Sequence, residues 1–301
     1  MKGLLRLILL LALVGAGVAW LVTRPRTISD AEVAGLSGDA TAGEAIFWAG
    51  GCASCHAAED ASGDARLVLG GGQAFPSDFG MFRAPNISPH PEHGIGDWTL
   101  AEFLTALQNG ISPEGEHYYP AFPYTAYRLA DRQDLADLHA FMITLPASDA
   151  PSLAHEVGFP FSIRRAVGLW NVLYLHDDFA VTGDLSEEEA RGRYLSEALA
   201  HCGECHTPRG PLGAVDRERW LHGAPSLTGP GTIPALTPDE LTWSEDEIAA
   251  YLNDGFTPDF DTAGGHMRSV IDNFSNLAAS DRAAVAAYLG IVPDAGRAGD
   301  D

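Results

Sequence analysis

The chain has 301 residues, of which 46% are hydrophobic and 20% are charged, so its composition is that of a globular protein and not of a disordered one. The length is sufficient for two domains of ordinary size. Acidic residues outnumber basic ones by 41 to 18, which gives a formal net charge of −23. Because a field of this sign repels nucleic acid, we expect no nucleic-acid partner.

The first 26 residues predict a membrane anchor or a signal segment. An apolar stretch interrupted only by Arg6 runs from Leu4 to Val22, which is close to the ~20 residues that a membrane-spanning helix needs. The small residues of Gly17-Val18-Ala19 also suit a signal-peptide cleavage site, but Trp20 would then lie just past the cut. We therefore expect a retained helix that anchors the chain in the inner membrane.

Two copies of one motif use all four cysteines and leave none for a disulfide. They are Cys52-Ala-Ser-Cys55-His56 and Cys202-Gly-Glu-Cys205-His206. This is the spacing at which two thiols attach to one c-type haem and the adjacent histidine becomes an iron ligand. A thioredoxin-like redox pair or a four-cysteine zinc site would not require a histidine after each second cysteine. The sequence therefore predicts two covalently bound haem c groups, and their iron ions are expected to be bound by His56 and His206.

The chain is predicted to contain two copies of one helical unit. Trp98–Gly110 is repeated as Trp243–Gly255, so position 98 corresponds to position 243 and position 110 to position 255. Each copy is expected to hold a helix, the cysteine motif, an irregular loop, a helix, a second loop and a closing helix. The expected helices are 40–50, 98–110 and 131–145 in the first copy, 166–174 between the copies, and 243–255 and 277–289 in the second. Gly43, Ile46 and Phe47 could face a later helix.

The predicted fold class is all-α, with two tandem cytochrome c domains after an N-terminal transmembrane helix. The expected boundaries are 1–26 for the anchor or signal segment, 27–38 for a tether, 39–150 for domain 1, 151–185 for the connection, 186–292 for domain 2 and 293–301 for an acidic tail. Because c-type haem is attached after export, we expect the globular part to lie in the periplasm.

The two haem sites are expected to differ on the side opposite the histidine. Met267, in a Gly-rich loop after His206, is predicted to be the thioether ligand of the second iron. When the two copies are aligned, Met267 corresponds to Phe122, and phenylalanine cannot bind iron. A five-coordinate or weakly water-ligated first haem is the leading interpretation. Four side chains remain as alternative ligands, although core packing or a surface position is the expected role of each: Met81, His90, His93 and His117.

We expect a backbone carbonyl to orient each histidine ring by accepting a hydrogen bond from the ring nitrogen that does not bind iron. An imidazole that binds iron usually donates its other N–H to a carbonyl oxygen, which fixes the ring. The segments that contain Pro85 and Pro234 occupy matching places in the two copies and are candidates to supply these carbonyls.

Several motifs resemble those of one known family over roughly residues 39–292. They are Gly192-Arg-Tyr-Leu195, His201–Gly210, Asn86-Ile-Ser-Pro89, Gly94–Trp98 and Tyr119–Tyr124. Together they resemble the cytochrome c subunits of membrane-bound alcohol, gluconate and fructose dehydrogenases. The resemblance implies a relay that accepts electrons from a periplasmic dehydrogenase subunit and passes them to a quinone or to a cytochrome or oxidase partner. Those subunits carry three haem domains, and their motif has methionine where this chain has Phe122.

An electron-transfer subunit is therefore favoured over a stand-alone enzyme. The sequence contains no dinucleotide-binding fingerprint, nucleophile motif or second metal cluster. A haem enzyme that acts on a small inorganic substrate, or a gas-binding sensor, would depend on an open coordination position at the first haem.

Overall fold

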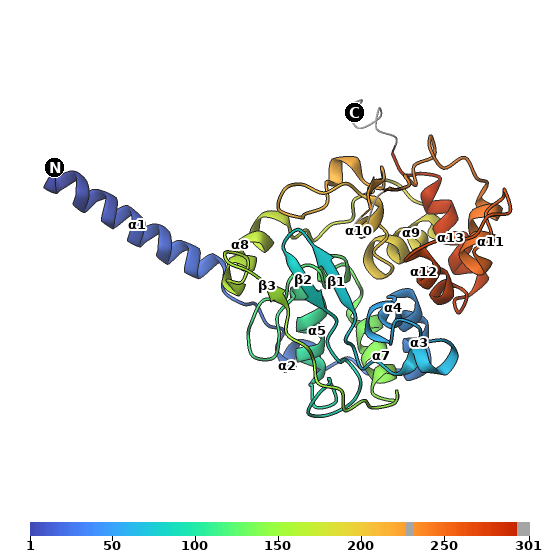
Figure 1. The fold of residues 1–301 in the computed structure, drawn as a ribbon, viewed down its shortest axis with the longest axis horizontal. Coiled ribbons are helices and arrows are strands. Elements are labelled where there is room, and N and C mark those ends of the chain that lie inside the picture. Colours follow the sequence, from blue (N-terminus) through green and yellow to red (C-terminus); the bar gives the residue numbers. More distant parts are fainter. Residues whose placement is uncertain (227–230, 294–301) are drawn as a thin grey trace.

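The computed structural model describes residues 1–226 and 231–293, so the tail expected at 293–301 lies outside the described residues except for its first position. Helix α1 (Lys2–Val22) projects alone from the globular body (Figure 1). None of its 21 residues is buried, and its most apolar stretch of 18 residues has a mean hydropathy of 2.4. By length and composition this helix could cross a membrane, and a signal sequence would meet the same criterion.

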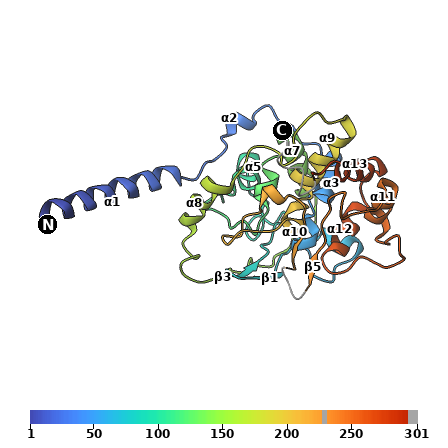
Figure 2. The ribbon, with the colours of Figure 1, turned by 90° about the horizontal axis from the view of Figure 1, so that it is seen from above.

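The body is mainly helical, and the two copies of the repeat follow one another in the chain (Figures 1 and 2). Helix α2 (Asp30–Val33) lies in the tether, before the first copy. The first copy contains α3 (Ala40–Ala49), α4 (Cys52–His56), the 3₁₀ turn η1 (Gly63–Leu67), α5 (Leu100–Asn109), α6 (Tyr124–Tyr127) and α7 (Arg132–Met142). Helix α8 (Arg164–Tyr174) lies in the connection. The second copy contains α9 (Glu187–Arg193), the π-helical turn η2 (Tyr194–Leu199), α10 (Gly203–His206), the 3₁₀ turn η3 (Arg217–Arg219), α11 (Glu245–Asp254), α12 (Met267–Phe274) and α13 (Ala279–Leu289).

Each copy is built on one close crossing between its first and its closing helix. Helix α3 packs across α7, and α9 packs across α13. A Cβ atom on Gly43 would lie 1.9 Å from the carbonyl oxygen of Asp137, and one on Gly192 would lie 1.8 Å from that of Ala284. Only glycine, which has no Cβ atom, allows the backbones of the two helices to come this close. The expectation that Gly43, Ile46 and Phe47 face a later helix is confirmed, since all three are buried and Phe47 packs 5.3 Å from the ring of Phe141.

The repeat is equally clear in the middle helices α5 and α11. Both start with a capping box, in which Thr99 pairs with Glu102 and Ser244 pairs with Glu247. Both end at a left-handed glycine, Gly110 with φ 62° and Gly255 with φ 77°. The same start and stop signals therefore produce the same helix in each copy.

The expectation of an all-α fold needs correction, because the described residues also form two small antiparallel sheets. One has the order β1 (Ala74–Ser77), β2 (Gly80–Arg83), β3 (Glu156–Val157), and the other pairs β4 (Ala224–Pro225) with β5 (Thr232–Ile233). Gly80 has a φ of 132°, and a Cβ atom there would lie 2.4 Å from the carbonyl oxygen of Glu156. This glycine lets the hairpin close against β3. Short β-ladders therefore order the loops that follow the cysteine motifs. The helical periodicity of the sequence did not predict these ladders.

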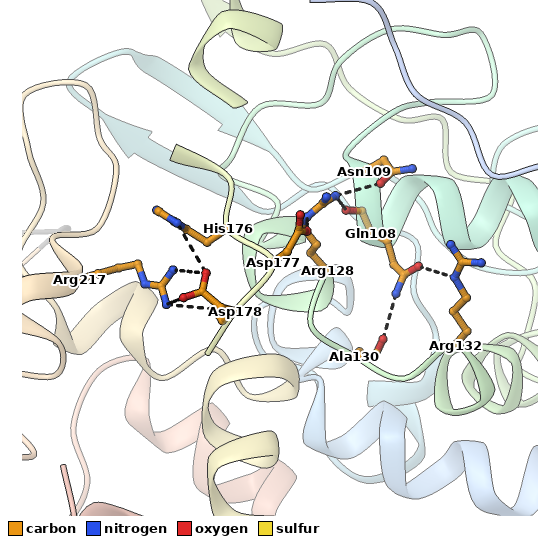
Figure 3. Close-up of polar contacts among 9 residues, drawn as sticks. All are labelled: Gln108, Asn109, Arg128, Ala130, Arg132, His176, Asp177, Asp178 and Arg217. Atoms are coloured by element: carbon orange, nitrogen blue, oxygen red, sulfur yellow. Dashed lines mark hydrogen bonds and ion pairs between the residues drawn. The ribbon is translucent and has the colours of Figure 1, made fainter. Parts of the chain in front are cut away.

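Two consecutive aspartates of the connection pair with different copies of the repeat (Figure 3). Asp177 pairs with Arg128 of the first copy, and Asp178 pairs with Arg217 of the second at 3.2 Å. Arg128 also donates to the carbonyl oxygen of Gln108, at the end of α5 (Figure 3). Because the two aspartates are 77% and 68% exposed, each ion pair adds little stability. Their effect is to hold the connection against both copies.

The helix crossings generate a prediction about stability. In an exposed helix alanine is more favourable than glycine by up to about 1 kcal/mol, whereas here the new methyl group would push two helices apart. Gly43→Ala and Gly192→Ala should each lower the free energy of unfolding by ~1–3 kcal/mol. Denaturant unfolding followed by circular dichroism will measure this. Gly35→Ala is the matched control, since nothing lies within 4 Å of its Cβ position. Greater stability in either test variant would contradict the prediction.

Candidate haem sites

Each cysteine motif forms a single helical turn, α4 or α10, directly after the first helix of its copy. A left-handed residue comes immediately before the first cysteine in both cases, Gly51 with φ 67° and His201 with φ 45°. This residue ends the preceding helix and allows the chain to start a new turn in another direction. Within the turn, the first cysteine and the histidine are half-buried and the second cysteine is exposed in both copies. The two motifs therefore present the same groups in the same way.

Both histidines are oriented by a proline carbonyl, as predicted. The Nδ1 atom of His56 lies 2.8 Å from the carbonyl oxygen of Pro85, and that of His206 lies 2.8 Å from the carbonyl oxygen of Pro234. Burial lowers the pKa of both imidazoles, which favours the neutral form that binds metals. With Nδ1 hydrogen-bonded in this way, Nε2 is the atom left for an iron ion.

The loop that carries each proline is closed against its motif by a glycine. The amide of Gly71 donates to the carbonyl of His56 at 2.8 Å, and the amide of Gly223 donates to that of His206 at 2.7 Å. Both glycines have positive φ, and a Cβ atom on Gly71 would lie 2.5 Å from the carbonyl group of Pro85. Each histidine thus lies in a cradle of loop backbone that is closed by a glycine, because glycine has no side chain.

Asn86 positions the first proline loop, a role that sequence reasoning did not assign. Its side-chain amide donates to the carbonyls of Ser148 and Ala150 at 2.9 and 2.7 Å, and its oxygen accepts from the backbone N–H of Ser88 at 2.9 Å. The residue is buried. The signals in the sequence were its place directly after Pro85 and the motif Asn86-Ile-Ser-Pro89, whereas Ala235 holds the matching place after Pro234.

Phe122 and Met267 lie at the ends of matching loops, which supports the alignment of the two copies, although Met267 is the first residue of α12 and not a loop residue as expected. Each loop follows the left-handed glycine of the preceding helix and is closed by an isolated bridge, Ile111 with His117 and Phe256 with Thr262. Phe122 and Met267 are both half-buried against the core. The ring of Phe122 lies among aromatic neighbours, 5.7 Å from Tyr118 and 5.9 Å from Tyr127. The first copy therefore has an apolar aromatic cluster where the second has a thioether.

Of the alternative ligands, His117 is not the exposed loop residue that the sequence favoured. It is buried, and its Nε2 atom lies 3.0 Å from the carbonyl oxygen of Thr23, just past the end of α1. His90 accepts backbone N–H groups from Glu92 and His93 through Nδ1 and stacks on the ring of His93 at 5.0 Å. These three rings are occupied by contacts of their own. Met81 lies in β2, where it pairs with Pro76 and Glu156.

The two motifs meet across the boundary between the copies. The hydroxyl of Tyr127 donates to the carbonyl of Gly50, just before the first motif, and its ring lies 5.8 Å from that of His201, just before the second. Asn273, on the helix that begins with Met267, donates to the hydroxyl of Ser54 inside the first motif at 2.8 Å. Helix α12 of the second copy thus packs on α4 of the first.

A buried polar chain supports the second motif from its own side. The indole N–H of Trp220 donates to the hydroxyl of Tyr288 at 2.9 Å, and this hydroxyl donates to Glu197 at 2.8 Å. Burial raises the pKa of Glu197. The Trp220 ring occupies the space in which a Cβ atom on Gly203 would lie, 2.0 Å away. This contact explains why the second motif has glycine where the first has Ala53.

The cysteine environment does not suit the two alternative interpretations. Burial raises the pKa of Cys52 and Cys202 to about 12, so neither thiol has the lowered pKa of a redox-active cysteine. Within residues 1–226 and 231–293, no three His, Cys, Asp or Glu side chains converge as a metal site would require. Paired thiols on one turn, an oriented imidazole and a glycine-lined cradle fit a covalently attached haem in each copy.

Comparison with known proteins agrees with this geometry. The family model described as cytochrome c matches residues 40–146 and 189–292. A "Diheme cytochrome c-type" protein of Cereibacter sphaeroides is 56% identical over 285 residues, which cover 94% of this chain and 96% of that protein.

Relatives also include subunits of larger enzymes. The "Fructose dehydrogenase cytochrome subunit" of Gluconobacter japonicus is 36% identical over 256 residues, 83% of this chain and 52% of that protein. The "Alcohol dehydrogenase (quinone), cytochrome c subunit" of Gluconobacter oxydans is 32% identical over 263 residues, 83% of this chain and 54% of that protein. The chain thus spans about half the length of these two subunits. It belongs to the cytochrome c family, with two cytochrome c domains and two covalently bound haem c groups.

Proposed function

We propose that this chain is a periplasmic electron-transfer subunit that takes electrons from a dehydrogenase and passes them to a quinone or to a cytochrome or oxidase partner of the respiratory chain. When bound, each haem c supplies a one-electron couple between ferrous and ferric iron. The observation that carries the proposal is the contact between the two cysteine motifs through Tyr127 and His201. The relatives named as cytochrome subunits of dehydrogenases support it.

In this proposal each residue of the motifs has a defined role. Cys52 and Cys55 hold the first haem, and Cys202 and Cys205 hold the second. His56 and His206 bind iron through Nε2, and the carbonyls of Pro85 and Pro234 keep their rings in place. An imidazole that donates a hydrogen bond is a more basic ligand, which tunes the iron.

The second copy is suited to a higher reduction potential than the first. A thioether favours ferrous iron, so Met267 would raise the potential of the site formed by His206. Phe122 supplies no ligand in the matching place. The two sites would therefore differ in potential, and this difference would set a preferred direction for electron flow.

Helix α1 would anchor the chain in the inner membrane with the body in the periplasm. The length of this 21-residue helix matches the thickness of the hydrocarbon core, and Arg24 and Arg26 come shortly after its end. Arg165 also donates to the carbonyl of Trp20 at 2.6 Å. The end of α1 is thus held by the body, which supports a retained helix over a cleaved one.

A second candidate function rests on Phe122 alone. If no side chain binds the first iron opposite His56, small ligands could occupy that position, as in a haem enzyme or a ligand-binding cytochrome. The aromatic cluster of Tyr118, Phe122 and Tyr127 would then form the wall of an apolar site.

Loss of the thioether should be visible in the spectrum of the second site. Met267→Ala in the haem-loaded protein should abolish the long-wavelength charge-transfer band of methionine-ligated ferric haem and lower the potential of one haem. Met81→Ala is the matched control and should leave both unchanged. A band that survives in Met267→Ala would show that another group binds the second iron.

The first site should respond to the opposite change. Wild-type ferrous protein should bind carbon monoxide at one haem, and Phe122→Met should suppress this binding by installing a second low-spin, methionine-ligated haem. The replacement conserves most of the side-chain volume, so the loop can accept it. His117→Ala should not alter the spectrum, because that ring is bound to Thr23. Two low-spin haems in the wild type would refute an open first site.

The relay itself can be tested in membranes of the source organism. Deletion of the chain should abolish electron flow from one sugar, alcohol or related substrate to oxygen, and expression of the wild type should restore it with two covalent haems per chain by mass spectrometry. A variant in which Cys202 and Cys205 are both alanine should not restore it. Restored flow in that variant, or rapid peroxide turnover by the purified protein alone, would count against an electron-transfer role.

A further inference from the structure

The connection between the two copies carries an apolar surface in an otherwise acidic protein. We define the α8 face as the exposed residues of helix α8, which are Ala166, Leu169, Val172 and Leu173. These positions recur at helical spacing, so they form an exposed apolar stripe, and Arg165 lies on the same side at the start of the helix. Three more apolar side chains precede the helix and are also exposed: Phe159, Phe161 and Ile163. A group of exposed apolar side chains of this size is typical of a contact surface.

The opposite side of α8 is fixed to the body and to the end of α1. The hydroxyl of Tyr124 donates to the side-chain oxygen of Asn171 at 2.7 Å. A Cβ atom on Gly168 would lie 2.8 Å from Nε2 of His117 and 2.9 Å from the carbonyl oxygen of Thr23. The helix therefore cannot turn its apolar face inward, because its other side is already packed.

The position of α8 decides what covers the exposed face. Arg165 donates to the carbonyl of Trp20 and to the hydroxyl of Thr23, at 2.6 and 2.9 Å, and its guanidinium lies 4.3 Å from the centre of the Trp20 ring. In both ribbon views α8 is the part of the body nearest to α1, whereas α11 lies at the far end (Figures 1 and 2). If α1 spans the membrane, α8 lies at the level where lipid head groups begin.

The charge of the two segments that contain α1 and α8 also fits a lipid surface, and the exposed acidic residues near them include Glu114 and Glu116, next to His117. No acidic residue lies between Glu156 and Asp177 or before Asp30, although the chain as a whole has 41. Arg24, Arg26, Arg164 and Arg165 belong to these two segments. Arginines and a tryptophan beside an apolar helix face are typical of a helix that lies in the membrane interface.

We propose that the α8 face lies in the outer surface of the inner membrane and contacts anionic phospholipid, so that the body rests on the bilayer as well as being tethered to it. This inference rests on the proposed anchoring by α1. The contact would fix the orientation of both haem sites relative to the membrane, because α8 is packed on the first copy through Tyr124 and the two copies contact each other through Tyr127 and His201.

Photo-crosslinking of the full-length, haem-loaded protein tests the contact. The protein is placed in vesicles of phosphatidylcholine and phosphatidylglycerol with a benzophenone amino acid in place of Leu173. A matched protein carries it in place of Phe260, which is 93% exposed in the loop between α11 and α12. We expect lipid adducts at position 173 and none at position 260. The additional changes Leu169→Gln and Val172→Gln should lower the adduct yield at position 173 severalfold.

Each other outcome overturns the inference in a distinguishable way. An adduct at position 173 with a second copy of the chain would identify a dimer surface instead. Equal lipid labelling at both positions, or none at position 173 while α1 is retained, would refute the lipid contact and leave the anchor and the relay intact. A mature chain that lacks Trp20 would refute the anchor together with the contact, without affecting the spectra of the two haem sites.

Discussion

The close crossing of first and closing helices is the constraint on which each haem site depends. Gly43 and Gly192 bring two helix backbones so close that a Cβ atom would lie within 2 Å of a carbonyl oxygen. The first helix of each copy leads into the cysteine turn through one left-handed residue. The crossing therefore fixes where the turn begins, and the proline loop and the histidine are built around that point. A glycine-lined cradle then leaves room for a flat cofactor beside the backbone.

The two sites share this frame but differ in the groups that surround it. Asn86 braces the proline loop of the first site, whereas the second site is supported by Trp220, Tyr288 and Glu197. Phe122 stands in an aromatic cluster where the second copy has Met267. The two copies thus share the groups that would attach the cofactor and differ in the side chains beside it. The proposed relay uses this difference.

The connection has more than one structural role. It contributes β3 to the sheet of the first copy, holds the end of α1 through Arg165, and pairs with both copies through Asp177 and Asp178. These contacts lie within one stretch of chain, from Glu156 to Asp178. The connection therefore links both copies to the end of α1, while the relative placement of the two copies also depends on their direct contacts through Tyr127, His201 and α12.

The sequence by itself determined the chemistry of this protein. The Cys-x-x-Cys-His spacing, the repeated helix with its Thr or Ser start and glycine stop, and the replacement of methionine by Phe122 are local patterns, and local patterns are set by covalent spacing and by hydrogen bonds between near neighbours. Even the two proline carbonyls could be predicted, because each lies at the same place in its copy. The small sheets, the burial of His117 against Thr23, the brace formed by Asn86 and the contact between Tyr127 and His201 could not. The β1–β2 and β4–β5 hairpins are local, but helical periodicity does not predict strand pairing. The pairing of β2 with β3 and the other three contacts join residues far apart in the chain, so only the tertiary structure, through packing and long-range hydrogen bonds, decided them.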